Sequence, residues 1–162
     1  MRSTRDSDFA GRRRARELVL RGLYERQLSA RADNDIATSL LDDAAEPRTD
    51  DADEAVSPDT DRGYLVELWR GTTREYDALL QALAGHVDRD VAALSPIERA
   101  LLVIGAWELV HRLDVPFRVV IDEAVRLAKS YGGTDGYKFV NGVLDKLAAR
   151  VRADEILARG GR

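Results

Sequence analysis

Four arginines, Arg12, Arg13, Arg14 and Arg16, stand together near the start of the chain. Guanidinium groups bind phosphates through several donors and stack on bases, so such a run is suited to single-stranded RNA. Similar runs also open many solvated helices that bind no nucleic acid. Taken alone, the run indicates a cationic surface and leaves its ligand open.

The segment Lys129–Lys146 offers a second set of groups suited to RNA. A helix start is predicted within it, and the free backbone amides of a helix start can bind a phosphate. Lys138 adds a positive charge there, and Tyr137 or Phe139 can stack on a base. Phe139 has an alternative interpretation as an ordinary core residue, because it falls on the same apolar stripe as Val143.

Groups for catalysis or metal binding are sparse. The best candidate is the segment His86-Val-Asp88-Arg-Asp90, and its alternative interpretation is a surface turn with a helix-end histidine. His111 has no second ligand at helical spacing, and no strand precedes a Gly-rich phosphate loop. Glu108 lies on an apolar helix, where we expect an arginine of a neighbouring helix to neutralise it. We therefore predict no enzyme, no metal site and no cofactor.

Composition indicates one compact domain in a reducing compartment. The 162 residues are 44% hydrophobic and 33% charged, and they include no cysteine. This content can bury a core, and the lack of cysteine fits the cytoplasm. The longest apolar run, residues 100–107, is far shorter than the roughly 20 residues that cross a bilayer. We expect a cytoplasmic protein without a membrane partner.

The net charge of −4 is unevenly distributed. Residues 1–16 carry six arginines against two acids, whereas residues 33–62 carry eleven acids against two arginines. The middle segment has few large apolar side chains, so burial there cannot offset the entropy cost of ordering. We predict a flexible acidic loop at residues 42–62, which we interpret as a screen against nonspecific RNA.

Outside that loop, apolar residues recur at helical spacing, which predicts an all-α fold of about seven helices. The helix that opens with Ser95-Pro-Ile-Glu98 has a capping box, and its apolar circumference places it at the centre of its bundle. Thr134 or Asp135 is predicted to cap the last helix. Six of these helices can be placed on the sequence, namely one from the arginine run to Leu28, then residues 34–41, 64–86, a helix from Pro96, residues 119–131 and residues 135–151.

Asn141 and Gly142 would indicate a turn in isolation, but they lie between apolar residues of a helical segment. We expect Gly142 to allow the close approach of another helix, with Asn141 bonding across that contact.

Several motifs, in this order along the chain, resemble the NusB family of transcription antitermination factors. The similarity extends from about residue 11 to residue 150. It implies an all-helical fold of two packed helical subdomains without catalysis. It also implies boxA-type single-stranded RNA of ribosomal RNA leaders as one partner, NusE, a small-subunit ribosomal protein, as another, and a transcription complex with RNA polymerase. The motifs are Arg12-Arg-Arg-Ala-Arg-Glu-Leu with Leu23-Tyr24, Trp107-Glu-Leu, Val115-Pro, Ile121-Asp-Glu-Ala-Val with Ala128-Lys129, and Lys138-Phe-Val-Asn-Gly-Val-Leu-Asp145.

The resemblance also implies which residues form the binding surfaces. Tyr24 and Glu98 would face NusE, although Glu98 also suits a capping role. The two RNA-binding regions are expected to meet in space. The residues expected to bind RNA are Arg12, Arg13, Arg14, Arg16, Asp135, Lys138 and Phe139.

The chain departs from its relatives at three places. Its acidic loop is longer, Gly136 stands where relatives often have serine, and Val103 stands where many have arginine. The expected organisation is a flexible basic arm at residues 1–11, one helical domain at 12–151 and a frayed tail at 152–162.

Two alternatives remain at this point. The first is a helical protein-interaction module whose basic residues bind an acidic protein without sequence-specific RNA recognition. The second is the RNA-binding accessory part of a ribosomal RNA methyltransferase, and we disfavour it because few residues follow Arg150.

Overall fold

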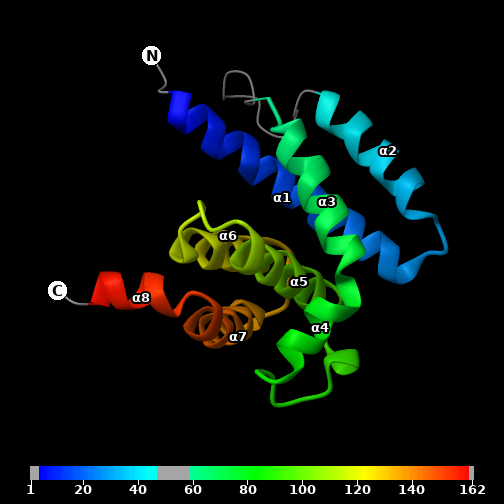
Figure 1. The fold of residues 1–162 in the computed structure, drawn as a ribbon. Helices are drawn as coiled ribbons and strands as arrows, with labels where there is room; N and C mark the ends of the chain where they lie inside the picture. The colour runs from blue at the N-terminus through cyan, green and yellow to red at the C-terminus, as the bar shows by residue number, and fades with distance from the viewer. Residues whose placement is uncertain (1–3, 47–58, 161–162) are drawn as a thin grey trace. The chain divides into compact units, whose positions relative to one another are not determined.

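The computed structural model describes residues 4–46 and 59–160, and every regular element in these ranges is helical (Figure 1). This confirms the all-α prediction. The chain divides into two compact units, Met1–Thr73 and Arg74–Arg162.

The first unit is built from α1 (Thr4–Leu28), α2 (Asp33–Ala45) and α3 (Arg62–Arg74). The three helices converge at Gly22 of α1. A Cβ atom there would lie 2.7 Å from both Leu40 Cδ1 of α2 and Trp69 Cζ3 of α3. Glycine is therefore required for this close approach, because any side chain would push the neighbouring helices away.

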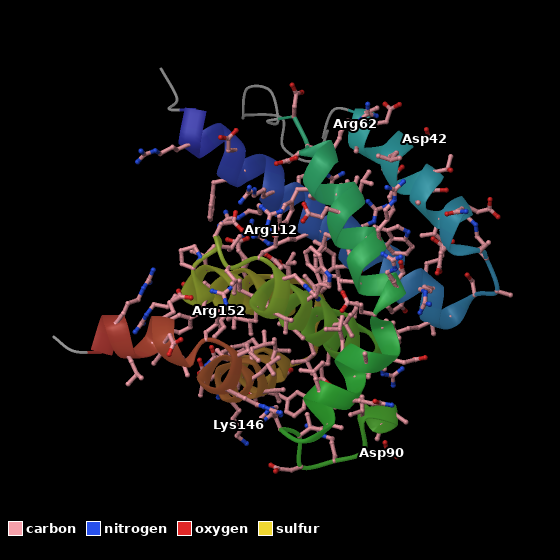
Figure 2. The ribbon with its side chains drawn as sticks, in the orientation of Figure 1. Asp42, Arg62, Asp90, Arg112, Lys146 and Arg152 are labelled. Atoms are coloured by element: carbon pink, nitrogen blue, oxygen red, sulfur yellow. The ribbon has the colours of Figure 1, made fainter. Side chains whose placement is uncertain are left out.

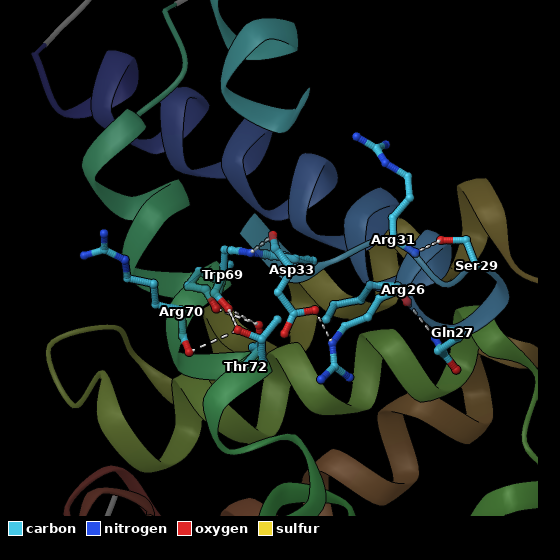
Figure 3. Close-up of polar contacts among 11 residues, drawn as sticks. Arg26, Gln27, Ser29, Arg31, Asp33, Trp69, Arg70 and Thr72 are labelled. Atoms are coloured by element: carbon cyan, nitrogen blue, oxygen red, sulfur yellow. Dashed lines mark hydrogen bonds and ion pairs between the residues drawn. The ribbon is translucent and has the colours of Figure 1, made fainter. Parts of the chain in front are cut away.

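Polar contacts fix the start of α2 against the other two helices (Figure 3). Trp69 Nε1 donates to the carbonyl of Asp33 at 3.2 Å, and Arg26 Nε donates to Asp33 Oδ1 at 2.8 Å. One residue of α2 thus receives hydrogen bonds from both α1 and α3.

The prediction that the first helix begins at the arginine run is wrong, because α1 already begins at Thr4. Contacts with residues 59 and 61 stabilise the part of α1 that precedes the arginine run. The Asp61 amide donates to the Gly11 carbonyl at 3.1 Å, and a Cβ atom on Gly11 would lie 2.9 Å from the Asp59 carbonyl oxygen. Residues 4–11 therefore continue a helix, and residues 1–3 of the predicted arm lie outside the described residues.

The predicted acidic loop begins later than expected, because α2 continues to Ala45. Arg21 of α1 pairs with Asp43 at 3.5 Å, and Arg62 Nη2 donates to the Leu41 carbonyl at 3.2 Å. These contacts hold the last turn of α2. Residues 47–58 of the predicted loop lie outside the described residues, and its last residue, Arg62, already belongs to α3.

The single helix predicted over residues 64–86 is two helices, α3 and α4 (Tyr76–Ala84), which are interrupted at Glu75. Thr72 and Thr73 donate from their hydroxyls to the Leu68 and Trp69 carbonyls, each at 2.7 Å, a pattern that bends helices. Glu75 also accepts a hydrogen bond from Trp107 Nε1 at 3.2 Å. The apolar spacing continues across this break, so periodicity alone predicts one helix.

The second unit contains α4, the short 3₁₀ helix η1 (Val91–Ala93) and four further α-helices. The central helix α5 (Pro96–His111) is buried at every residue from Ala100 to Leu109, as its apolar circumference predicts. Its predicted capping box is confirmed, since Ser95 Oγ accepts from the Glu98 amide at 3.1 Å and Glu98 accepts from the Ser95 amide at 3.4 Å. The remaining helices are α5 (Pro96–His111), α6 (Phe117–Tyr131), α7 (Gly136–Val151) and α8 (Ala153–Gly160).

The prediction of a frayed tail is wrong for residues 153–160, which form α8. Arg152, just before α8, is 3% exposed and caps the end of α5 by donating to the Leu109 carbonyl at 2.7 Å and the Arg112 carbonyl at 2.8 Å (Figure 2). It also pairs with Glu155, whose Oε1 accepts from the Phe117 amide at 3.1 Å at the start of α6. Buried hydrogen bonds therefore anchor α8.

The prediction for Asn141 and Gly142 is also wrong. Asn141 is exposed and donates to Asp145 Oδ2 at 3.4 Å on its own helix. A Cβ atom on Gly142 would meet no heavy atom within 4 Å among the described residues. No helix of the described part of the chain approaches α7 at this point, so the glycine has no packing role here.

Candidate nucleic-acid interface

Arg12 of α1 is held between a carboxylate and an aromatic ring. Its Nε lies 3.8 Å from Asp61 Oδ2, and its guanidinium carbon lies 4.8 Å from the centroid of Tyr64. Asp61 also caps α3, because its Oδ1 accepts from the Tyr64 amide at 2.9 Å. The side chain of Arg12 remains 33% exposed, so a phosphate can reach it.

The other arginines of the run differ in accessibility. Arg13 is half-buried and lies over the exposed ring of Phe9, 4.9 Å from its centroid. Arg14 is also half-buried and donates to Glu17 Oε1 at 3.2 Å. Arg16 is only 2% exposed and lies 5.3 Å from the centroid of Tyr64. Three of the four side chains are therefore partly exposed, and one is buried.

The start of α7 presents an exposed ion pair instead of a capped end. Asp135 has a left-handed backbone, φ 65°, and its side chain makes no capping hydrogen bond, contrary to the prediction that Thr134 or Asp135 caps this helix. Its carboxylate lies 3.3 Å from Lys138 Nζ, and the two side chains are 72% and 65% exposed. Because exposed pairs of this kind contribute little stability, a phosphate can displace Asp135 from Lys138 at small cost.

Aromatic rings beside this ion pair carry further cations. Phe139 is half-buried rather than a core residue, and the guanidinium of Arg89 lies over its ring, 4.5 Å from the centroid. Lys129 Nζ lies 4.9 Å from the centroid of Tyr137. The surface at the start of α7 therefore combines positive charge with flat apolar faces, which suits a nucleotide.

The two residues predicted to face a protein partner lie in different units. Tyr24 of α1 is 41% exposed, and Leu28, one turn further, is 60% exposed. Glu98 is half-buried and used in its capping box, and its Oε1 would lie 3.4 Å from a Cβ atom on Gly136. Relatives often have serine at position 136, and a serine here would contact Glu98. With Gly136, this chain lacks that contact.

Sequence reasoning missed Asp61 and Tyr64, which hold Arg12, and it missed Arg89, whose guanidinium lies over Phe139. The sequence predicts Tyr64 only as the start of a helix, yet Tyr64 is buried with two guanidinium groups over its ring. Each of these residues is distant in sequence from the group that it contacts, so local spacing carries no signal for it. The arginine run belongs to the first unit and the α7 start to the second, so their meeting in space stays a prediction.

The segment His86–Asp90, which the sequence offers as a candidate for metal binding, has a structural role instead. Asp90 Oδ1 accepts from the Ala92 amide at 3.0 Å and caps η1. In the described ranges, no three His, Asp or Glu side chains gather so that they could hold a metal ion. None of the described helices is long and apolar enough to span a bilayer.

Comparison with known protein families shows that residues 13–149 of the chain match the NusB family. The chain belongs to the NusB family. It is 49% identical over 150 residues to the transcription antitermination protein NusB of Ralstonia pickettii, covering 93% of this chain and 90% of that protein. It is 46% identical over 154 residues to NusB of Methylobacillus flagellatus, with the same two coverages.

The fold supports the same assignment. The structure of T. maritima NusB superposes with a TM-score of 0.71 at 26% identity, covering 86% of this chain and 91% of that one. The chain is therefore a transcription antitermination protein of the NusB family, and this family is not enzymatic. The predicted family, fold class and absence of catalysis are confirmed.

Proposed function

We propose that this protein binds boxA-type single-stranded RNA of ribosomal RNA leaders together with NusE, within a cytoplasmic transcription complex that contains RNA polymerase. The observation that best supports this function is the cation–aromatic surface at the start of α7 in a chain of the NusB family. Such a surface binds phosphates by charge and bases by stacking, and it requires no catalytic group.

In this proposal, Arg12, Arg13 and Arg14 bind phosphates. Each is accessible and already oriented by a neighbouring ring or carboxylate, so little side-chain entropy is lost on binding. Arg16 is buried beside Tyr64, where it supports the ring on which Arg12 lies. Its contribution to RNA binding is therefore mainly its charge and its support of Tyr64.

At the start of α7, Lys138 exchanges Asp135 for a phosphate, and Phe139 supports a base. Asp135 then becomes an acceptor for base or sugar donors, because its carboxylate is 72% exposed. The α7 surface would therefore refine sequence preference, whereas the arginines supply most of the electrostatic attraction.

NusE would bind the exposed Tyr24 and Leu28 of α1 and also contact Glu98. Tyr24 supplies the amphipathic aromatic surface that is common at protein interfaces, and Leu28 extends its apolar area by one helical turn. Glu98 can accept a partner's cation through its carboxylate while its helix remains capped.

The test is fluorescence anisotropy of a labelled boxA RNA and a scrambled RNA, titrated at two salt concentrations with and without NusE. We expect tighter binding of boxA RNA, further strengthened by NusE. With three to five phosphates bound, the logarithm of affinity should fall with the logarithm of salt with a slope of about −2 to −3.5. Equal binding of the two RNAs, or no binding even with NusE, would favour a helical protein-interaction module instead.

A further inference from the structure

We propose that Arg89 is an additional RNA-binding residue, whose guanidinium lies on Phe139 and stacks with a base while contacting a phosphate of single-stranded RNA. This inference rests on the proposed function and adds a residue that the motifs do not include. Arg89 is exposed, precedes η1 and is distant in sequence from α7.

The geometry of the stack supports this role. The guanidinium carbon of Arg89 lies 4.5 Å from the ring centroid of Phe139, so the cation covers one face of that ring. A base cannot use the covered face directly while Arg89 remains there. The outer face of a guanidinium plane is itself a stacking surface for bases, and its edge can donate to a phosphate. Arg89 thereby extends the platform that Phe139 begins.

The charge of Arg89 is available for a ligand. Among the described residues, it has no ion pair, and its contact with Phe139 leaves the donors at the edge of the guanidinium unused. The acids at η1 and near the start of α7 have other partners, since Asp90 caps η1, Asp135 pairs with Lys138 and Glu98 belongs to a capping box. Asp88, which is adjacent in sequence, is exposed and screened by solvent.

Space for a nucleotide adjoins Arg89. A surface hollow of about 480 Å³ lies beside it, and Tyr76, Leu80 and Arg99 line this hollow together with Arg89. Arg99 supports the wall formed by η1 by donating to the Ala92 carbonyl at 2.9 Å and the Leu94 carbonyl at 3.0 Å. Apolar and aromatic walls with a few polar groups are typical of sites that take a flat ligand. A base stacked on Arg89 can therefore turn its edge toward this hollow.

Two substitutions separate stacking from charge. Arg89→Ala should weaken boxA binding about 5- to 10-fold and make the salt slope about 0.7 units shallower, because it removes one stack and one phosphate contact. Arg89→Lys should keep the salt slope but recover only part of the affinity, because an ammonium group has no planar face. A 2-aminopurine base within boxA, quenched by the wild-type protein, should stay brighter with both variants.

Arg118 provides a matched control, because it is exposed and lies 5.5 Å from the centroid of Phe117. Arg118 lies near the beginning of α6. Lys129, which lies over Tyr137 of α7, is near the end of the same helix, about 16 Å away along its axis. Arg118→Ala should bind like the wild type. If Arg89→Ala also does so while Lys138→Ala weakens binding, this inference is overturned and the proposed function stands. If the wild type binds boxA and scrambled RNA equally, both are overturned.

Discussion

Two arginines of the α1 run and two cations near the start of α7 have different kinds of neighbour, although Arg12 also lies over Tyr64 and Lys138 also pairs with Asp135. Arg12 and Arg14 are held by carboxylates, at 3.8 Å from Asp61 and 3.2 Å from Glu17. In the second unit, Arg89 and Lys129 lie over aromatic rings instead. A carboxylate competes with RNA for its cation, whereas a ring leaves the charge in place and offers a stacking surface.

Because their neighbours differ, the two cationic regions can serve separate tasks in RNA binding. The α1 region is expected to supply affinity that depends strongly on salt. The α7 region is expected to make fewer phosphate contacts and to add stacking, which depends little on salt but strongly on the bases. Substitutions in the α1 region should therefore change mainly the salt dependence of RNA affinity, and substitutions in the α7 region mainly its dependence on the bases.

The largest effect is expected from replacing Arg12, Arg13 and Arg14 together with glutamine. Loss of three phosphate contacts should lower boxA affinity about 100-fold at roughly 0.1 M salt and make the salt slope about 2 units shallower. Anisotropy titrations over a series of salt concentrations measure both quantities. A triple variant of the exposed Arg70, Arg118 and Arg150 changes net charge equally. An equal loss in that control would show that overall charge, not this run, governs binding.

A smaller effect of another kind is expected from Phe139→Leu. Leucine keeps much of the apolar volume but has no flat face, so affinity should fall about 10-fold with an unchanged salt slope. Thermal unfolding followed by circular dichroism checks that the fold persists. If the slope changed as in the arginine variant, the proposed division of tasks would be wrong.

The sequence predicts much of the scaffold for these two regions but few of their contacts. The capping box at Ser95 and Glu98 and the buried circumference of α5 follow from local spacing alone. The interruption at Glu75 does not, because it depends on threonine side chains and on a contact with Trp107. Likewise, α8 is anchored by Arg152 through carbonyls of α5, which no local pattern encodes. The arginine run can be recognised in the sequence, but the burial of Arg16 cannot be predicted from it.

A third type of arginine environment, the pair of the buried Arg152 with the partly exposed Glu155, should affect stability and not RNA binding. Burial of the Glu155 carboxylate raises its pKa, but hydrogen bonds from the Phe117 amide and Arg152, with the charges of Arg152 and Arg159, lower the pKa below its ordinary value. The pair's contribution is therefore complete above the unfolded-state pKa of about 4.3 and is lost as pH falls through the lower folded-state pKa.

Glu155→Gln should accordingly lower the free energy of unfolding by about 1 kcal/mol at neutral pH and reduce its dependence on acid pH. Urea unfolding at several pH values measures this. The affinity for boxA RNA should equal that of the wild type. An unchanged acid dependence in the variant would assign the titration to other carboxylates.

Gly142→Ala tests whether RNA binding by the α7 region depends on the stability of the helix or on its surface groups. A Cβ atom at this position meets nothing within 4 Å in the described part of the chain, so alanine should stabilise the helix by about 0.5–1 kcal/mol. RNA affinity should not change. Gly105→Ala is the contrasting variant, because its Cβ atom would lie 2.7 Å from Leu144 Cδ1 and should destabilise the protein. If Gly142→Ala were destabilising, its helical position would not be the open surface described above.

The smallest effect is expected from Asp61→Asn, which would make the surroundings of Arg12 resemble those of Arg89. Asparagine can still accept from the Tyr64 amide and cap α3, but it no longer attracts Arg12 at 3.8 Å. Because such partly exposed pairs are weak, boxA affinity should rise only about twofold at low salt, and the gain should disappear at high salt. Asp43→Asn is a matched control, since Asp43 pairs with Arg21 at 3.5 Å in the same unit and the net charge changes equally. A rise with Asp61→Asn alone would show that this carboxylate competes with RNA for Arg12, whereas equal rises would trace the effect to net charge.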